Sequence, residues 1–202
     1  EKNTGESPAA QKIVAAAKKF TDADTPVATD VGQHQMWTAQ YYPFEKPRTF
    51  ISSGGLGTMG FGMGAAIGAC VGSGKKTVLV TGDGSFHMNL NELCTAVTYR
   101  LPLVILLADN NTLGMVRQWQ TPFYNKRYSQ TTLDRKTDYV KLAEAFGAKG
   151  FLLDRPENAE TVLAKAFKED GPVLVDCKID IDDKVLPMIA PGKSFDSIIT
   201  KI

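Results

Sequence analysis

Two polar motifs, separated by one predicted helix and one predicted strand, carry the clearest chemistry in this sequence. The first is Gly82-Asp83-Gly84-Ser85, and the second is Asp109-Asn110-Asn111. A carboxylate oxygen, an amide oxygen and a loop carbonyl are the hard oxygen ligands that Mg²⁺ binds. A glycine beside the carboxylate lets the backbone approach an anion closely, and Ser85 adds a hydroxyl and a backbone N–H. The two motifs therefore predict a site for a metal ion and a diphosphate.

The elements around these motifs are expected to place them at one edge of a sheet. Residues 76–81 and 102–108 form short apolar runs, which are typical of buried strands, and residues 89–100 have apolar positions at helical spacing. Open α/β sheets bind ligands beyond the carboxyl ends of their strands, where Asp83 and Asn110 both fall. Either residue alone could be a helix cap or a turn residue. Together, at two strand ends, they favour the metal site.

The rest of the chain alternates between strand and helix patterns. We predict a first helix that starts at Ser7-Pro8, and later helices near 35–42, 139–146 and 157–169. The stretch 54–74 is predicted to be a further helix with a glycine loop at its start. Further strands are predicted at 26–30, 49–51, 149–153 and 173–177. This order predicts an α/β fold: a three-layer α/β/α sandwich with a mainly parallel sheet of about six strands.

Residues 112–132 show no clean apolar period and contain two clusters of aromatic and basic side chains. An irregular segment of ~20 residues within a compact domain is usually functional. We therefore expect a lid or a substrate loop here.

Composition excludes several classes of protein. The chain has 202 residues, 22% charged residues and a net charge of +1, so it can form one domain and shows no sign of binding nucleic acid. No apolar run is long enough to span a membrane. The three cysteines are interpreted as buried, reduced thiols of a cytoplasmic protein. The chain begins with Glu1 and a polar segment, 1–7, that we interpret as a linker, so we expect one domain of a longer polypeptide.

Two further motifs point to phosphate. Gln33 and His34 lie in a polar turn, 31–34, that follows a predicted strand, and a neutral imidazole could donate a hydrogen bond to a phosphate. Gly55-Leu56-Gly57-Thr58-Met59-Gly60 matches the G-x-G-x-x-G pattern of nicotinamide dehydrogenases. The preceding strand is short and no acidic strand residue follows ~20 positions later, so the dehydrogenase remains a minor alternative.

The spacing from Gly82-Asp83-Gly84 to Asn110 resembles the thiamine-diphosphate motif. The whole chain resembles the C-terminal, diphosphate-binding domain of the large, catalytic subunit of acetohydroxyacid synthase (acetolactate synthase). Four segments carry the resemblance to this family: residues 30–37, 54–60, 113–120 and 185–192. The departures are Asp109, Gly64 and His87, which stand where asparagine, proline and glutamine are common, and none of them damages the predicted site.

The resemblance implies a role for individual residues. Asp83 and Asn110 would bind Mg²⁺ by their side chains, and Thr112 by its backbone carbonyl. Gln33, His34, Gly84 and Ser85 would hold the diphosphate, with Val31, Gly32 and Gly114 in the same cofactor-binding segments. Gly57 and Met115 would contact the aminopyrimidine, Met59 would support the bent cofactor, and Trp119 would lie near the substrate entry.

The resemblance also implies what this chain lacks. The proton-relay glutamate of the family lies in a pyrimidine-binding domain of a second subunit, and FAD is held largely by a middle domain. The full enzyme would be a cytoplasmic homodimer or larger assembly, with a small regulatory subunit as a further possible partner. It would condense pyruvate with pyruvate or 2-oxobutyrate, and the isolated chain would be inactive. Another thiamine-diphosphate-dependent 2-oxo acid decarboxylase or carboligase is the alternative.

Overall fold

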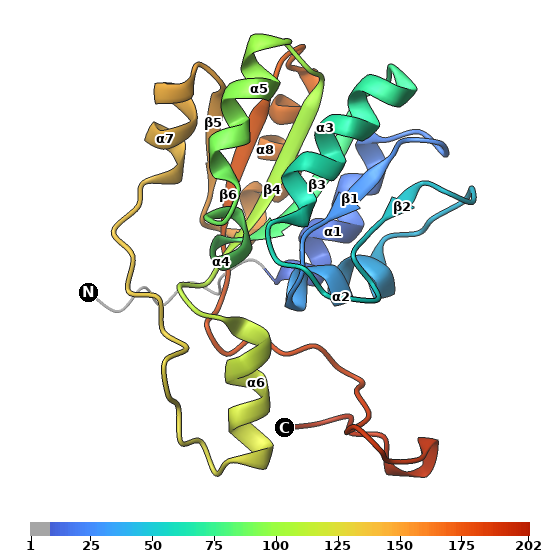
Figure 1. Ribbon diagram of the computed structural model, residues 1–202, viewed down its shortest axis with the longest axis vertical. Helices are drawn as coiled ribbons and strands as arrows, with labels where there is room; N and C mark the ends of the chain where they lie inside the picture. Colours follow the sequence, from blue (N-terminus) through green and yellow to red (C-terminus); the bar gives the residue numbers. More distant parts are fainter. Residues whose placement is uncertain (1–8) are drawn as a thin grey trace.

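Six parallel strands form one sheet between two layers of helices (Figure 1). The computed structural model describes residues 9–202, so the predicted linker 1–7 and the helix start at Ser7-Pro8 lie outside the described residues. The strand order is β2-β1-β3-β4-β6-β5. The strands are β1 (Val27–Thr29), β2 (Phe50–Ile51), β3 (Thr77–Gly82), β4 (Leu103–Asp109), β5 (Lys149–Leu153) and β6 (Val173–Lys178). The predicted three-layer α/β fold is confirmed.

The helices divide between the two faces of the sheet. One layer contains α1 (Ala10–Ala17), which a 3₁₀ turn extends to Phe20, together with α2 (Gln33–Tyr41) and α8 (Ala159–Lys168). The other contains α3 (Phe61–Ser73), α5 (Leu93–Thr98) and α7 (Tyr139–Phe146). A single turn, α4 (Asp83–Phe86), follows β3 directly.

The central strand β4 shows why the sheet is buried on both faces. Val104 and Leu106 point into the core under α1, α2 and α8, whereas Ile105 and Leu107 point into the core under α3, α5 and α7. Side chains alternate between the faces of a strand, so a strand covered on both faces must be apolar at every position. This is the reason that the sequence of β4 is a continuous apolar run.

Of three predicted elements, one agrees with the structure and two differ from it. The stretch 54–74 agrees with its prediction: a glycine loop comes first, and the helix begins at Phe61, after Gly60 with its left-handed φ of +90°. The helix expected over 89–100 is a 3₁₀ turn, Leu90–Glu92, followed by the short α5. Gln33 and His34, expected in a turn, form the first turn of α2.

The segment predicted as an irregular lid, 112–132, contains a helix, α6 (Gly114–Phe123). Met115, Trp119 and Phe123 recur every four residues, which is a helical signal that the prediction missed. These three residues do not form a buried apolar face: the buried residue of α6 is Gln118, whereas Trp119 and Phe123 are partly exposed. In Figure 1, α6 lies beyond the carboxyl edge of the sheet, alongside the C-terminal segment.

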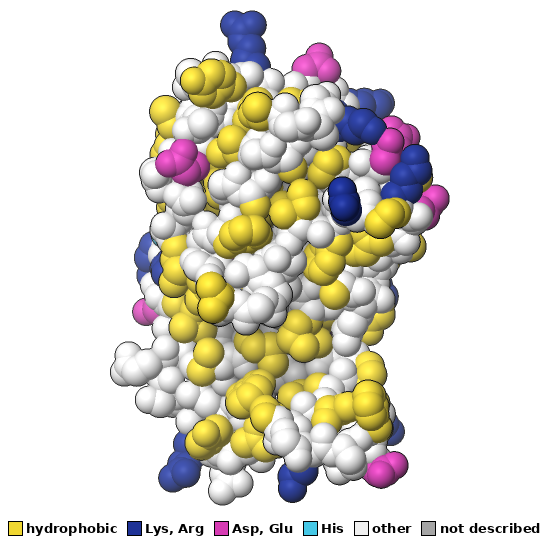
Figure 2. Space-filling view, turned by 45° about the vertical axis from the view of Figure 1, so that its right-hand side comes forward, with side chains coloured by type: hydrophobic (Ala, Val, Ile, Leu, Met, Phe, Trp, Pro, Cys, Tyr) yellow, Lys and Arg dark blue, Asp and Glu magenta, His cyan; other side chains and the backbone are white. Residues whose placement is uncertain are grey.

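The surface combines charged and apolar regions. Figure 2 shows one face on which Lys, Arg, Asp and Glu lie mostly toward the rim, while the centre is largely hydrophobic or uncharged. Cys70 and Cys177 are buried, but Cys94 is exposed, so the prediction of three buried thiols is wrong for Cys94. It lies on the outer face of the short α5. No helix within residues 9–202 has the length and apolarity needed to cross a membrane.

Candidate functional site

A cavity of about 280 Å³ lies at the carboxyl edge of the sheet, where β1, β3 and β4 end. Every residue predicted to bind the cofactor or the metal lines it: Val31, Gly32, Gln33, His34, Gly57, Met59, Asp83, Gly84, Ser85, Asn110, Thr112, Gly114 and Met115. The strand register brings them together, since β3 and β4 are paired up to Gly82 and Ala108. Segments far apart in the sequence therefore meet at one sheet edge.

Asp83 is a buried carboxylate that is only half satisfied. Its Oδ1 accepts a hydrogen bond from the N–H of Gly84 at 2.9 Å, but its Oδ2 is buried without a partner. Burial, and then the nearby charge of Asp109, raise the pKa of Asp83 to about 7. A buried carboxylate with a free oxygen is stabilised by a bound cation. Asp83 thus has the properties expected of a metal ligand.

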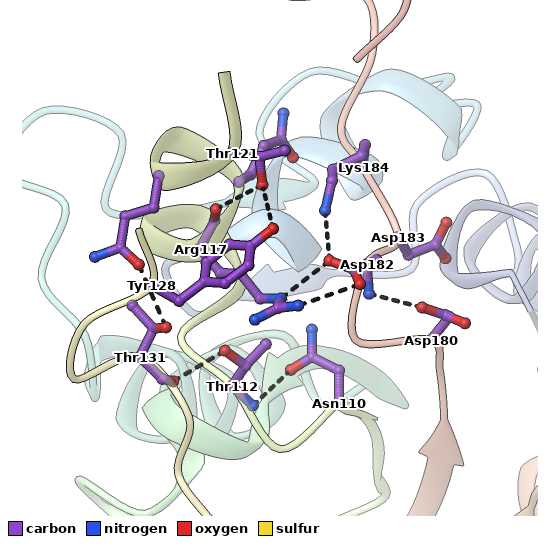
Figure 3. Close-up of polar contacts among 12 residues, drawn as sticks. Asn110, Thr112, Arg117, Thr121, Tyr128, Thr131, Asp180, Asp182, Asp183 and Lys184 are labelled. Carbon is purple, nitrogen blue, oxygen red and sulfur yellow. Dashed lines mark hydrogen bonds and ion pairs between the residues drawn. The ribbon is translucent and has the colours of Figure 1, made fainter. Parts of the chain in front are cut away.

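Asn110 and Thr112 lie in one tight loop (Figure 3), and both line the same cavity as Asp83. The N–H of Thr112 donates to Asn110 Oδ1 at 3.2 Å, and the Thr112 hydroxyl donates to the carbonyl of Thr131 at 2.9 Å. Asn111 between them has a positive φ of 54°, a conformation that asparagine tolerates better than most residues. A carboxylate, an amide and a loop carbonyl are all oxygen donors, so these residues fit a Mg²⁺ ion.

The acidic residue next to Asn110 has its own counter-ion. Asp109 is buried and forms an ion pair with Lys178, which also pairs with Asp176 at 2.8 Å. Burial raises the pKa of Asp176 to about 6. Lys178 therefore offsets the extra negative charge that Asp109 introduces behind the metal site.

His34 packs against two glycines at the base of the cavity. A Cβ on Gly82 would lie 2.8 Å from His34 Nδ1, and one on Gly32 would lie 2.9 Å from its Cε1. Burial lowers the pKa of His34 to about 3, so the ring is neutral. Its Nε2 is buried and has no hydrogen-bond partner. The predicted neutral imidazole is present.

The side chains of Gln33 and Ser85 make contacts that the sequence did not suggest. Gln33 Nε2 donates to Gln118 Oε1 at 2.9 Å and to the carbonyl of Asp183 at 2.8 Å. The Ser85 hydroxyl donates to the carbonyl of Val31 at 2.7 Å. Either group would have to give up these bonds in order to donate to a phosphate.

Gly84 also differs from expectation. It was expected to allow an anion close to the backbone, but a Cβ there would lie 2.9 Å from Leu113 Cδ2 and 3.7 Å from Met59 Cε. The glycine therefore makes room for Leu113 and Met59, which lie against it.

The glycine loop that carries Gly57 and Met59 is held by a residue that sequence reasoning missed. Asp30 accepts hydrogen bonds from the backbone N–H groups of Val31, Gly60 and Gly62, at 2.9, 2.8 and 3.2 Å. These bonds satisfy otherwise unpaired donors at the start of α3. A buried aspartate at the end of a strand, before a glycine-rich helix start, was the available signal.

Trp119 does not line the first cavity. It lies in a second cavity of about 620 Å³ with Met115, Val116, Tyr124 and Arg127, and in a third of about 460 Å³ beside Met36 and Met188. Met115 lines all three cavities. Helix α6 thus separates the predicted cofactor side of the site from a larger apolar space.

The loop after α6 and the C-terminal segment converge on Arg117. Its guanidinium pairs with Asp182 at 3.0 Å and lies 3.9 Å from the centre of the Tyr128 ring (Figure 3). On the other side of the site, Arg135 donates to the backbone carbonyl of Asp83 at 2.9 Å. Neither arginine was predicted to position the site: Arg117 lies in α6, and Arg135 follows the predicted loop 112–132.

The dinucleotide alternative does not fit this arrangement. The strand before Gly55 is β2, which has two residues and lies at the edge of the sheet. A dinucleotide fingerprint normally follows the first, central strand of a βαβ unit.

Comparison with known proteins agrees with this geometry. Residues 30–177 match the family model described as thiamine pyrophosphate enzyme, C-terminal TPP binding domain. The chain is 48% identical over 181 residues to the acetolactate synthase isozyme 2 large subunit of Escherichia coli (strain K12), covering 89% of this chain and 33% of that protein.

Two further relatives cover still more of the chain. It is 46% identical over 196 residues to the acetolactate synthase large subunit of Porphyra purpurea, covering 96% of this chain and 32% of the relative. The chain is also 44% identical over 190 residues to the acetolactate synthase large subunit of Lactococcus lactis, covering 94% of this chain and 33% of that protein. The chain thus spans about a third of the length of the curated relatives that it matches. It belongs to the family of C-terminal domains of thiamine pyrophosphate (thiamine diphosphate) enzymes.

Proposed function

We propose that this chain is the magnesium- and thiamine-diphosphate-binding part of an acetolactate synthase large subunit. One observation carries the proposal: Asp83, whose Oδ2 is buried without a partner, lines a cavity together with Asn110, Thr112 and several glycines. The carboxylate, the amide and the carbonyl of Thr112 are oxygen ligands suited to a divalent cation that would hold a diphosphate. The identity to acetolactate synthase large subunits supports the same function.

Position in the cavity supports a proposed role for each residue. Asp83 and Asn110 bind Mg²⁺ by side-chain oxygens and Thr112 by its carbonyl. His34, Gln33, Gly84 and Ser85 lie on the diphosphate side, next to Val31, Gly32 and Gly114. Gly57, Met59 and Met115 lie toward the rest of the cofactor, and Trp119 faces the substrate side.

The reaction proposed for the full enzyme is the condensation of pyruvate with pyruvate or 2-oxobutyrate, with loss of CO₂. The bound cofactor supplies the electron sink for breaking and forming the carbon–carbon bonds. The residues of this chain anchor and orient it, and Met115 and Trp119 border the apolar space in which substrates would lie. Another thiamine-diphosphate-dependent decarboxylase or carboligase remains the second candidate, because both use the same anchoring residues.

Further parts complete the proposed enzyme. We place a pyrimidine-binding domain of a second subunit, with its proton-relay glutamate, against this chain in a homodimer or larger assembly. Exposed apolar side chains, including Leu56, Val71 and Met88, support such a contact. The relatives are named large subunits, which supports a smaller partner subunit. FAD belongs to the full-length enzyme, and three unpaired cysteines support a cytoplasmic location.

A binding experiment tests the proposal. Titration calorimetry of the chain with thiamine diphosphate should show saturable binding that depends on Mg²⁺. The variant Asp83→Ala should lose at least about tenfold in affinity, since it removes a charged ligand from the site. Asp154→Ala is the matched control, because Asp154 follows β5 at the same edge of the sheet but is exposed and outside the cavity. Equal affinity in wild type and Asp83→Ala would refute the metal assignment.

A turnover assay tests the need for a second domain. The isolated chain, given thiamine diphosphate, Mg²⁺ and pyruvate, should form no acetolactate at enzyme-like rates. Acetolactate formation would contradict the proposed division of labour. In the full-length enzyme, acetolactate as the main product would separate the synthase from a simple decarboxylase, which would release acetaldehyde.

A further inference from the structure

Gln118 is fully buried, although it lies at the centre of a helix whose other residues are partly exposed. Its side-chain amide both accepts a hydrogen bond from the backbone of Val185 and donates one to it. The N–H of Val185 donates to Gln118 Oε1 at 2.8 Å, and Gln118 Nε2 donates to the carbonyl of Val185 at 2.9 Å. Gln118 Nε2 also lies 3.2 Å from Met188 Sδ. These two bonds fix the orientation of the Gln118 amide, because Oε1 must face the N–H of Val185 and Nε2 must face its carbonyl.

The fixed amide of Gln118 in turn fixes Gln33. Because Oε1 of Gln118 faces Gln33, the atom that meets it must be the donor, Gln33 Nε2. The second proton of Nε2 goes to the carbonyl of Asp183. Gln33 Oε1 is therefore turned the other way, is buried without a partner, and lies beside Gly114 in the loop of Asn110. The amide of Gln33 thus presents its acceptor, and not its donors, to the cavity.

Gln118 also holds residues 180–202, the C-terminal strap. Val185 is fully buried under it. Gln33 also holds the strap, through its 2.8 Å hydrogen bond to the carbonyl of Asp183. Two other contacts of the strap's first residues are weaker: the ion pair of Arg117 with the exposed Asp182, and a 3.4 Å hydrogen bond from Trp37 Nε1 to the carbonyl of Lys184. Exposed ion pairs contribute little to stability. The linked amides of Gln118 and Gln33 are therefore the main polar anchor of the strap.

We infer that Gln118 is a positioning residue that couples docking of the C-terminal strap to the cofactor cavity through Gln33. When the strap is docked, Val185 orients Gln118, and Gln118 holds the Gln33 acceptor toward the metal-binding loop. There it can accept hydrogen bonds from water molecules on a bound Mg²⁺ ion, whereas a diphosphate oxygen offers it no proton. This inference rests on the proposed function and assigns Gln33 to the hydration shell of the metal.

The test compares Gln118→Met with Gln120→Met. Gln120 lies on the same helix and pairs with the backbone of Ser129 in the same two-way manner, but it does not touch Gln33 or the strap. Two quantities are measured on the 202-residue chain: the affinity for thiamine diphosphate with Mg²⁺, and the rate of tryptic cleavage after Lys184 and Lys193, which lie in the strap. Intact-mass spectrometry identifies the cleavage products.

We expect Gln118→Met to weaken cofactor binding by about tenfold and to accelerate strap cleavage by about tenfold, which corresponds to leaving buried polar groups unpaired. Gln120→Met should match wild type in both measurements. Gln33→Ala should weaken cofactor binding and accelerate cleavage by a smaller factor. In the double variant Gln33→Ala/Gln118→Met, the two effects on cleavage should be less than additive, because the two residues share the Gln33–Gln118 hydrogen bond.

Other results of these measurements would refute the coupling, the Gln33–Gln118 link or the proposed function separately. Faster cleavage with unchanged cofactor affinity in Gln118→Met would make Gln118 an anchor of the strap only and would refute the coupling. Additive effects in the double variant would refute the Gln33–Gln118 link. If wild type itself fails to bind the cofactor, the proposed function fails, while the double-variant cleavage series still tests that link. If Gln118→Met does not fold, Gln33→Ala tests the link from the cavity side, and wild-type cleavage rates in that variant would refute it.

Discussion

Gly114 and Gln33 lie so close together that a Cβ built on Gly114 would be 1.9 Å from Gln33 Oε1. The replacement Gly114→Ala should therefore displace Gln33 from the cavity wall. We expect the free energy of unfolding to fall by about 1–3 kcal/mol, as in other overpacked sites, and the affinity for thiamine diphosphate to fall by about tenfold. Denaturant titration and calorimetry measure the two effects.

The control for this substitution is Gly68→Ala. Gly68 lies in α3, and a Cβ there would meet no atom within 4 Å. Alanine should raise the free energy of unfolding by about 0.5–1 kcal/mol, because it suits a helix interior better than glycine. Normal cofactor binding by Gly114→Ala would show that Gln33 can move without cost.

The raised pKa of Asp83 predicts how stability depends on pH in the absence of metal. With a pKa of about 7 in the folded state against an ordinary value of 3.8, the native protein holds a proton that the unfolded chain releases between these values. Stability from this group is therefore lost as the pH rises from about 4 to about 7. His34, with its pKa lowered to about 3, acts in the opposite direction, because the unfolded chain takes up a proton below its ordinary 6.5.

The variant Asp83→Asn separates these two contributions. The free energy of unfolding of wild type, minus that of Asp83→Asn, should decrease as the pH rises from 4 to 7 in the presence of a chelator. Mg²⁺ binds the ionised carboxylate, so wild-type affinity for Mg²⁺ with thiamine diphosphate should drop as the pH falls below about 7. A pH-independent difference between the two proteins would contradict the burial of an ionisable Asp83.

Asp30 should matter for the glycine loop more than for overall stability. Replacement of Asp30 by asparagine puts an N–H₂ group in place of one of the oxygens that accept from Val31, Gly60 and Gly62. We expect the free energy of unfolding to fall by about 1–3 kcal/mol and hydrogen exchange to become faster at the amides of Gly60 and Gly62. Asp24→Asn, at an exposed ion pair, should leave these amides protected. Unchanged exchange in Asp30→Asn would show that the loop is held by other contacts.

Lys76 offers a test of stability without any effect on the site. Its ammonium group donates to the carbonyls of Phe167 and Glu169, at 2.5 and 2.9 Å, and so caps the C-terminus of α8. Lys76→Met should lower the free energy of unfolding by about 1–2 kcal/mol, since charged donors stabilise a helix C-terminus. The neighbouring Lys75→Met, which removes only an exposed pair with Asp24, should cost less than about 0.5 kcal/mol. Both variants should bind thiamine diphosphate as wild type does, and a weaker binder would indicate long-range distortion of the sheet.

Local sequence patterns were sufficient for the framework of this protein. The apolar runs of β3 and β4 have no polar interruption, since both faces of the sheet are covered, and the positions of Asp83 and Asn110 just after them follow directly. The ends of helices were less predictable. Gly60 stops α3 from starting earlier because it adopts a left-handed conformation, and a neighbouring glycine with an ordinary φ looks the same in the sequence.

The sequence alone therefore determined the class of fold, the edge of the sheet that binds ligand, and the residue types that suit a metal and a diphosphate. Tertiary structure alone decided which polar side chains support them. Gln118 meets Val185 across 67 residues, and Asp30 meets Gly62 across 32. A buried amide or carboxylate is stable only where distant backbone groups complete its hydrogen bonds, and no local pattern records which distant groups these are.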